Sequence, residues 1–382
     1  MNPQNNFKAI EFFSGIGGLH YGLQNASPLS SIVQSFDMNE LANSVYHHNF
    51  KKKPNNRAID HLKINEIEKY NAQVWLMSPP CQPFTRGGKY LDDLDPRTRP
   101  LIHLIDMLQK LEYKPIYIFL ENVLNFEKSK TREILVKTLN ELGYTIQEYL
   151  LSPVQLGVPN DRLRYYLLAK KSISNSESHK RKTSYLELNA DEYLIKQFPE
   201  SSKNFSNNLL LNLFGFTPQN NQLYKLEKFI DTKLDYEKFK VPMAYIKKRK
   251  NYDFDIVNTN SKHSSTFTKA YGSKHILGSG SLLQTETSNV DDKDLQKLVI
   301  QENVENEETI KLIESFKLRF FSPQEVAKLM CFPVKENNNE NKSFVNLEFP
   351  TNTTIRQQHQ LLGNSVNVLV VSTLIYHLLN DL

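Results

Sequence analysis

The sequence predicts a doubly wound α/β fold, with a mostly parallel sheet and a second, smaller lobe. Over the first 170 residues, short apolar runs alternate with segments of helical apolar spacing, which is typical of a parallel sheet covered on both faces. A glycine-rich turn follows the first apolar run, where open α/β sheets bind nucleotides. From about residue 172 the pattern becomes polar and irregular, which indicates the second lobe.

The expected elements follow from the spacing of the apolar residues. Strands are expected at residues 7–13, 32–36, 74–77, 116–120 and 165–169. Helices are expected at residues 40–48, 101–111 and 129–142. We expect a mobile loop at the asparagine-rich residues 337–341 and a periodic tail at 354–382 that packs back on the first domain. The apolar run 366–379 is shorter than the ~20 residues that span a bilayer, so it predicts a buried helix and no membrane segment.

The composition is that of a globular protein. The chain has 382 residues, of which 39% are hydrophobic and 23% charged, enough for a large domain and a lobe. Its two cysteines, Cys81 and Cys331, lack zinc-ligand spacing, so we expect no metal and a reducing compartment: the cytoplasm, the nucleus or both. The formal charge of +5 and the basic clusters at 180–182 and 247–250 permit a nucleic-acid partner, although each cluster alone is also typical of a solvated face.

The glycine-rich turn contains Gly15, Gly17 and Gly18 and opens a helix. Glycines let the backbone turn sharply and approach a ligand. A dinucleotide fingerprint would place a third glycine where the chain has His20, so the turn fits a nucleoside better than a pyrophosphate. A tight turn without a ligand is the alternative.

Two carboxylates could complete an adenosine site at this turn. Asp37 ends the second expected strand, where it can accept hydrogen bonds from both ribose hydroxyls. Alternatively, it caps the helix that begins near Glu40. Asp60 can accept from the adenine amino group, and is otherwise a surface carboxylate.

The strongest functional pattern is Met-Ser-Pro-Pro-Cys-Gln-Pro-Phe-Thr at residues 77–85. Its prolines stiffen a loop directly after a strand and present Cys81 at the tip, although a lone cysteine is ordinarily a small buried hydrophobe. Glu121, at the end of another expected strand, can face the same cleft. A thiolate that attacks carbon 6 of a pyrimidine needs a proton or hydrogen bond at N3, which a carboxylic acid supplies.

Two arginines precede the last expected strand. Strand alternation would point Arg162 and Arg164 to the same side. Either can hold Glu121, the base oxygen O2 or a phosphate, and structural salt bridges are the alternative.

In this order the motifs resemble the cytosine-5 methyltransferase family over nearly the whole chain, and residues 321–333 and 361–366 resemble the family's last two motifs. The segments 79–86 and 160–165 look most like the Dnmt2 branch, whose characterised members methylate tRNA. Residues 266–273 and 278–281 also resemble that branch, except that Thr266 replaces the cysteine of its usual Cys-Phe-Thr tripeptide. This replacement lies outside the expected catalytic set.

The resemblance implies an S-adenosylmethionine-dependent methyltransferase fold, with S-adenosyl-L-methionine as the methyl donor and no metal. The implied catalytic residues are Cys81, the nucleophile, with Glu121, Arg162 and Arg164. The implied cofactor-binding residues are Phe13, Gly15, Ile16, Gly17, Gly18, Asp37, Met38, Ile59, Asp60, Ser78, Pro80, Asn364, Ser365 and Val366. The implied organisation is a catalytic domain at 1–190, a target-recognition lobe and hinge at 191–345, and a C-terminal segment at 346–382 that returns to the catalytic domain.

The resemblance further implies that the substrate is cytosine 38 in the anticodon loop of tRNA-Asp, with DNA methylation by the same active site as the alternative. Either cytosine must leave its stack, which costs little in a single-stranded loop and roughly a few kcal/mol in a duplex. Two other hypotheses are weaker. An inactive nucleic-acid-binding module would not need Cys81, Glu121 and Asp37 together, and a nicotinamide oxidoreductase would need the missing third glycine. We take the chain as a monomer.

Overall fold

The computed structural model describes residues 6–80, 92, 95–172, 193–216, 222–247, 254–286, 307–335 and 345–382. The chain divides into two compact units, and each is described by itself. The first comprises Met1–Ser152, Leu163–Thr217 and Val368–Leu382, and the second Pro153–Arg162 and Pro218–Asn367. The predicted boundaries at 190 and 345, with the roles given to the segments between them, stay predictions.

Among the described residues, seven strands form the sheet of the first unit, in the order β2-β1-β3-β4-β6-β5-β7. They are β1 Lys8–Phe12, β2 Ser31–Phe36, β3 Val74–Met77, β4 Tyr117–Val123, β5 Tyr144–Leu151, β6 Arg164–Lys171 and β7 Leu194–Ile195. Strands β1 to β4 pair in parallel, and β6 runs antiparallel to both β4 and β5. This is the doubly wound, mostly parallel sheet that the sequence predicts, with β5 and β7 added to the five expected strands.

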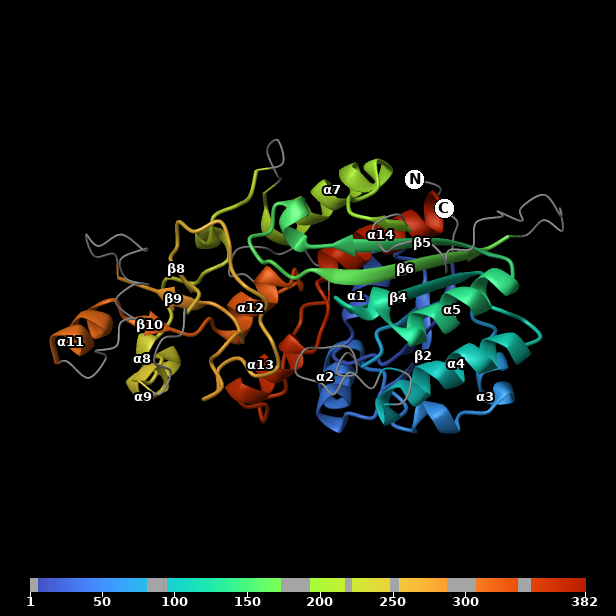
Figure 1. Cartoon of the computed structure of the whole chain (residues 1–382), viewed down its shortest axis with the longest axis horizontal. Helices are drawn as coiled ribbons and strands as arrows, with labels where there is room; N and C mark the ends of the chain where they lie inside the picture. The colour runs from blue at the N-terminus through green and yellow to red at the C-terminus, as the bar shows by residue number, and fades with distance from the viewer. Residues whose placement is uncertain are drawn as a thin grey trace. The chain divides into compact units, whose positions relative to one another are not determined.

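Helices cover both faces of this sheet (Figure 1). They are α1 Gly18–Ala26, α2 Glu40–Phe50, α3 Ile64–Glu68, α4 Arg99–Lys110, α5 Lys130–Glu141, α7 Lys203–Phe214 and α14 Val368–Asn380. Trp75 and Met77 of β3 share a core with α4 and α5. On the other face, α1 packs on α14 so closely that a Cβ at Gly22 would lie 2.9 Å from Val371. Because both faces are covered, β3 is buried along its whole length, as its unbroken apolar sequence predicts.

The C-terminal apolar run forms the buried helix α14, as predicted. The stretch Ile355–Asn380 is long and apolar enough to cross a membrane, with a mean hydropathy of 1.4, but 78% of its apolar window is buried inside the protein. A core helix of a globular protein gives the same combination, and α14 packs on β4 and β6.

The second unit contains short elements. They are α8 Tyr236–Phe239, α9 Met243–Lys247, β8 Ile256–Val257, β9 Leu282–Gln284, α11 Glu307–Ser315, β10 Leu318–Arg319, α12 Pro323–Leu329 and α13 Ile355–Gly363. Strand β9 pairs with β8 in parallel and with β10 in antiparallel. The expected loop at 337–341 lies outside the described residues.

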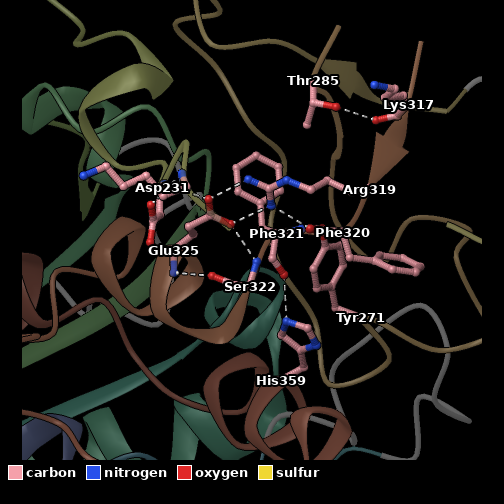
Figure 2. A network of polar contacts seen from close by, with 11 residues as sticks. Asp231, Tyr271, Thr285, Lys317, Arg319, Phe320, Phe321, Ser322, Glu325 and His359 are labelled. Atoms are coloured by element: carbon pink, nitrogen blue, oxygen red, sulfur yellow. Dashed lines mark hydrogen bonds and ion pairs between the residues drawn. The ribbon is translucent and has the colours of Figure 1, made fainter. Parts of the chain in front are cut away.

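A buried ion pair organises this unit (Figure 2). A terminal nitrogen of Arg319 lies 2.7 Å from Oε1 of Glu325, and the two side chains are 3% and 1% exposed. Glu325 also accepts hydrogen bonds from the backbone N–H groups of Ser322 and Asp231. The bidentate arginine and these two donors satisfy the carboxylate, which is the condition under which a buried charge pair is tolerated.

Candidate active site

The glycine-rich turn links β1 to β2 and α1. The backbone N–H of Ser14 donates to the carbonyl of Phe36 at 3.0 Å. Gly15 and Gly17 have φ values of +52° and +90°. A Cβ added at Gly17 would lie 2.3 Å from the Phe50 ring, whereas one added at Gly15 would meet no atom within 4 Å. Gly17 is therefore required by packing, and Gly15 borders open space that a ligand can enter.

Asp37 is bound to this turn. Its Oδ2 accepts from the N–H of Gly15 at 2.8 Å, and its Oδ1 accepts from the N–H of Asn39 at 2.8 Å. Burial raises the pKa of Asp37 above its ordinary value. Asn39, and not Asp37, caps α2, because the Asn39 side chain accepts from the first backbone amides of that helix. The helix-cap alternative for Asp37 is thus excluded, and each of its oxygens retains capacity to accept from a ribose hydroxyl.

The other predicted cofactor residues near the turn differ in exposure. Ile16, Gly18 and Ile59 are buried, and Asp60 is half-buried in the short helix η1 (Ile59–His61). Phe13 is half-buried with φ +58°, and Met38, two residues after β2, is 65% exposed. An open glycine, a buried carboxylate and an exposed apolar side chain suit the adenosine part of a cofactor. No cluster of three metal-ligating side chains occurs in the described part of the chain.

The segment before Cys81 is held at two points. The Ser78 hydroxyl donates to the carbonyl of Phe13 at 3.1 Å, which joins this segment to the glycine turn. The side-chain amide of Asn122 donates to the carbonyl of Pro79 at 3.4 Å, which joins it to β4. Pro80 is exposed. Cys81 itself lies outside the described residues, so its role as nucleophile stays a prediction.

Glu121 and Arg164 lie together at the ends of β4 and β6. Nε of Arg164 is 3.7 Å from Oε1 of Glu121, and the side chains are 15% and 10% exposed. Antiparallel pairing of Val123 with Arg164 brings the two side chains together. One strand, β4, thus carries both the expected acid and, at Asn122, a contact to the segment that leads to Cys81.

Arg162 precedes strand β6, whereas Arg164 begins it. Strand alternation therefore does not extend to Arg162, and the prediction that both arginines point to the same side stays a prediction. The guanidinium of Arg162, 3% exposed, donates to the carbonyls of Phe267 at 3.1 Å and Gly363 at 3.3 Å, and to that of Ser365. Arg162 therefore binds two segments of the second unit to each other, and its part in the reaction stays a prediction.

Asn364, Ser365 and Val366 follow α13 in the second unit. The N–H of Asn364 donates to the carbonyl of Gln360, and the N–H of Ser365 to that of Leu362. Their position is fixed by the end of the helix and by Arg162. Their expected contact with the cofactor stays a prediction.

Thr266, which stands where the Dnmt2 branch usually has cysteine, binds the Arg162 loop. Its hydroxyl donates to the carbonyl of Asp161 at 2.6 Å. Asn160 reinforces the same connection, because its amide donates to the Ser265 carbonyl at 3.0 Å. The replacement thus supplies a hydrogen-bond donor stronger than a thiol.

A buried polar group under the glycine turn was missed by the sequence reasoning. Glu11 Oε1 accepts from the N–H of His20 at 3.1 Å, and the Tyr46 hydroxyl lies 2.9 Å from Glu11 Oε2 and 2.7 Å from Nδ1 of His20. Burial raises the pKa of Glu11 to about 8 and lowers the pKa of His20 to about 3. The feature that could have revealed it is a carboxylate among the apolar residues that follow Lys8 in β1.

Comparison with known proteins identifies the family. The family model described as C-5 cytosine-specific DNA methylase matches residues 7–380. The chain belongs to the C-5 cytosine-specific DNA methylase family. These are methyltransferases of the kind that use S-adenosylmethionine, so the family resemblance and the fold expected from the sequence are both confirmed.

Relatives within this methylase family match nearly the whole chain. A tRNA (cytosine(38)-C(5))-methyltransferase of Spodoptera frugiperda is 38% identical over 369 residues, which cover 96% of this chain and 98% of the relative. A DNA (cytosine-5)-methyltransferase of Dictyostelium discoideum is 35% identical over 379 residues, covering 96% and 93%. The crystal structure of a mutant of Spodoptera frugiperda DNMT2 matches with a TM-score of 0.75 and 36% identity, covering 98% of this chain and all of that one.

Proposed function

We propose that this methylase family member transfers a methyl group from S-adenosylmethionine to carbon 5 of cytosine 38 in the anticodon loop of tRNA-Asp. One observation carries the chemistry: the segment leading to Cys81 is bound both to the glycine turn, through Ser78, and to the strand of Glu121, through Asn122. The glycine turn of the expected cofactor pocket, the segment that leads to Cys81 and the strand of the expected acid are thereby tied together. Full-length similarity to a tRNA (cytosine(38)-C(5))-methyltransferase supports the substrate.

The residues fit an adenosine-bearing cofactor. Asp37 offers carboxylate oxygens to ribose hydroxyls, and Gly15 borders space beside it. When bound, S-adenosylmethionine supplies an electrophilic methyl group on a sulfonium. The protein's task is to hold that methyl group in line with carbon 5 of the base and to exclude water.

In the proposed reaction the Cys81 thiolate adds to carbon 6 of cytosine, which makes carbon 5 nucleophilic. Glu121 donates a proton or hydrogen bond to N3, where negative charge accumulates. Arg164, 3.7 Å from Glu121, holds that carboxyl group in place. After methyl transfer, loss of the proton on carbon 5 and of Cys81 restores the aromatic ring.

The covalent step is tested with Cys81→Ala. Turnover should be lost and S-adenosylmethionine binding kept, because the thiolate serves the base while other residues form the cofactor pocket. RNA that carries 5-fluorocytosine should become bonded to Cys81, since fluorine blocks the last elimination. Cys331, fully buried, serves as the internal control. Methylation by Cys81→Ala, or an adduct on Cys331, would contradict the mechanism.

DNA is the second candidate substrate, and similarity to a protein named DNA (cytosine-5)-methyltransferase favours it. We expect tRNA to be preferred, because a loop cytosine leaves its stack at little cost while a duplex resists by roughly a few kcal/mol. The measurement is methyl incorporation into a tRNA-Asp transcript, the same transcript with uridine at position 38, and duplex DNA at one salt concentration. Faster methylation of the duplex would overturn the preference.

We propose that the basic clusters bind phosphate groups of the tRNA backbone. Residues 180–182 and 248–250 lie outside the described residues, and Lys247 ends α9. Neutralising residues 247–250 should weaken tRNA binding and reduce its salt dependence by a slope of roughly one per lost phosphate contact, without moving the methylated position. An unchanged salt slope would exclude this cluster from the interface.

A further inference from the structure

We propose that Glu11 is a positioning residue for the glycine turn at residues 13–17, because its carboxyl group joins the strand before the turn to the helix after it. The inference rests on the proposed binding of S-adenosylmethionine at this turn. It goes beyond that proposal, because Glu11 is completely buried and is not among the residues expected to contact the cofactor.

The hydrogen bond of Glu11 spans the whole turn. Glu11 lies in β1, one residue before the strand ends at Phe12, and its Oε1 accepts from the backbone N–H of His20 at 3.1 Å. His20 lies in the first turn of α1, nine positions after Glu11, and Gly15 and Gly17 lie between the two residues. A bond between the two ends of a loop reduces the number of conformations that the loop can adopt. The carboxyl group therefore restrains the glycine turn from both of its ends.

Helix α1 receives from Glu11 an acceptor that its own N-terminus does not supply. Its N-cap residue is Gly17, which has a φ of +90° and no side chain to act as a cap. No acidic residue occupies the first turn of α1, a helix that the structure describes in full. The first backbone N–H groups of a helix need acceptors from outside the helix. Glu11 supplies one of these acceptors from β1.

Glu11 is itself held in place by aromatic side chains. The hydroxyl of Tyr46, in α2, lies 2.9 Å from Oε2 of Glu11 and 2.7 Å from Nδ1 of His20. The His20 ring stacks on the ring of Phe50, with centroids 3.8 Å apart. Phe50 is also the ring that a Cβ at Gly17 would meet. The carboxyl group, the start of α1 and the glycine turn thus belong to one packed cluster.

Glu11 fits this cluster in its protonated form. Burial, with a smaller contribution from the charge of Asp37, raises the pKa of Glu11 to about 8, so the group is mostly uncharged at neutral pH. Its proton can then lie between Oε2 and the Tyr46 oxygen, and the Tyr46 proton is left for Nδ1 of His20. A glutamine at this position would reproduce the pattern, with its carbonyl toward the N–H of His20 and its amide toward Tyr46.

The decisive variant is Glu11→Met, which fills the same space and removes both oxygens. A turn that adopts its binding conformation in about one molecule of ten binds its ligand about 10-fold more weakly. The Kd of S-adenosylmethionine, measured by calorimetry, should therefore rise about 10-fold, while kcat on a tRNA-Asp transcript at saturating cofactor stays within about twofold of wild type. Without any cofactor, backbone hydrogen exchange should become faster in a peptide that covers residues 13–20.

Three further variants separate positioning from stability. Glu11→Gln keeps the hydrogen bonds, so its Kd should stay within about twofold of wild type. Tyr46→Phe keeps the packed ring and removes one hydroxyl, so its Kd should be intermediate. Leu139→Ala is the matched control for lost stability, because it opens a cavity in the core around α5 and touches no part of the glycine cluster. It should alter neither the Kd nor the exchange at residues 13–20.

Wild-type Kd and exchange in Glu11→Met would overturn the inference, as would equal changes in Leu139→Ala or a Glu11→Gln that binds as weakly as Glu11→Met. If Glu11→Met does not fold, a wild-type Kd in Tyr46→Phe overturns it instead. The proposed function fails separately, if Cys81→Ala still turns over. The exchange measurement needs neither cofactor nor RNA, so the two failures can be told apart.

Discussion

The glycine turn and the Arg162 region use the same kind of bond for different purposes. At the turn, Asp37 binds the backbone of Gly15 and keeps acceptor capacity beside open space. In the second unit, the guanidinium of Arg162 is enclosed by carbonyls, among them those of Phe267 and Gly363. A side chain that binds backbone can prepare a ligand site or hold a fold together, and the space around it decides which.

The largest effect is expected from replacement of Arg162, whose guanidinium is enclosed by backbone carbonyls. Arg162→Met should lower the free energy of unfolding by about 4 kcal/mol, because each buried carbonyl left without a donor costs about 1–3 kcal/mol. Arg164→Met is the matched control, since its 3.7 Å contact with Glu121 is longer than a hydrogen bond and should matter for turnover and less for stability. Thermal and denaturant unfolding of both variants measure the difference. Equal stability of the two variants would remove the contrast between the arginines.

The next effect separates two neighbouring glycines. Gly17→Ala should destabilise the protein by about 3 kcal/mol, because the methyl group meets the Phe50 ring and the backbone is left-handed. Gly15→Ala meets no neighbour, so it should cost only about 1 kcal/mol of stability and instead weaken S-adenosylmethionine binding. Denaturant unfolding and calorimetry check the pair. The reverse ranking would show that Gly15 is the packed residue.

A smaller effect is expected at Asp37, which lies beside the open space at the glycine turn. Asp37→Ala should weaken S-adenosylmethionine binding by about 2 kcal/mol, the cost of leaving ribose hydroxyls without an acceptor, and should leave RNA affinity unchanged. Asn39→Ala is the control, because it removes the cap of α2 without touching a carboxylate. Unchanged cofactor affinity in Asp37→Ala, or equal losses in both variants, would take Asp37 out of the pocket.

The smallest effect depends on pH. The pKa of Glu11 is about 8 in the folded protein and near its ordinary 4.5 when unfolded, so its protonated form stabilises the fold at low pH. That contribution is complete below pH 4.5 and is lost as the pH rises through 8. Between pH 6.5 and 8, where His20 is neutral in the folded protein, wild type should lose about 1.5 kcal/mol of stability relative to Glu11→Gln. If the free energies of unfolding of the two proteins change equally with pH across this range, the raised pKa of Glu11 is contradicted.

The sequence predicted those strands and helices whose own residues show an apolar pattern. Strand β3 lies at the expected residues 74–77, because four consecutive apolar residues have one stable place in a covered sheet. Strand β5 was missed, since it contains Gln147 and Glu148. The latter can be buried because Arg132, from α5, and the Tyr165 hydroxyl, from β6, both bind it. A partner that comes from another element cannot be seen in the strand's own sequence.

The residues of the candidate site likewise fall into those that local sequence revealed and those whose partners are distant in the sequence. Gly15 and Asp37 were found because Asp37 directly follows β2 and Gly15 lies three residues after β1, where short-range pattern suffices. The surroundings of Arg162 were not, because its partners lie 105 and about 200 positions away.

The arrangement of the first unit also constrains the order in which the protein can fold during synthesis. Helix α14, which packs on α1 and on β4, is translated after every residue of the second unit. Until the ribosome releases it, the face of the sheet that α14 covers remains apolar and exposed. The domain begun first is therefore completed last, and its apolar face stays exposed for longer than in a protein whose two domains follow one another in the sequence.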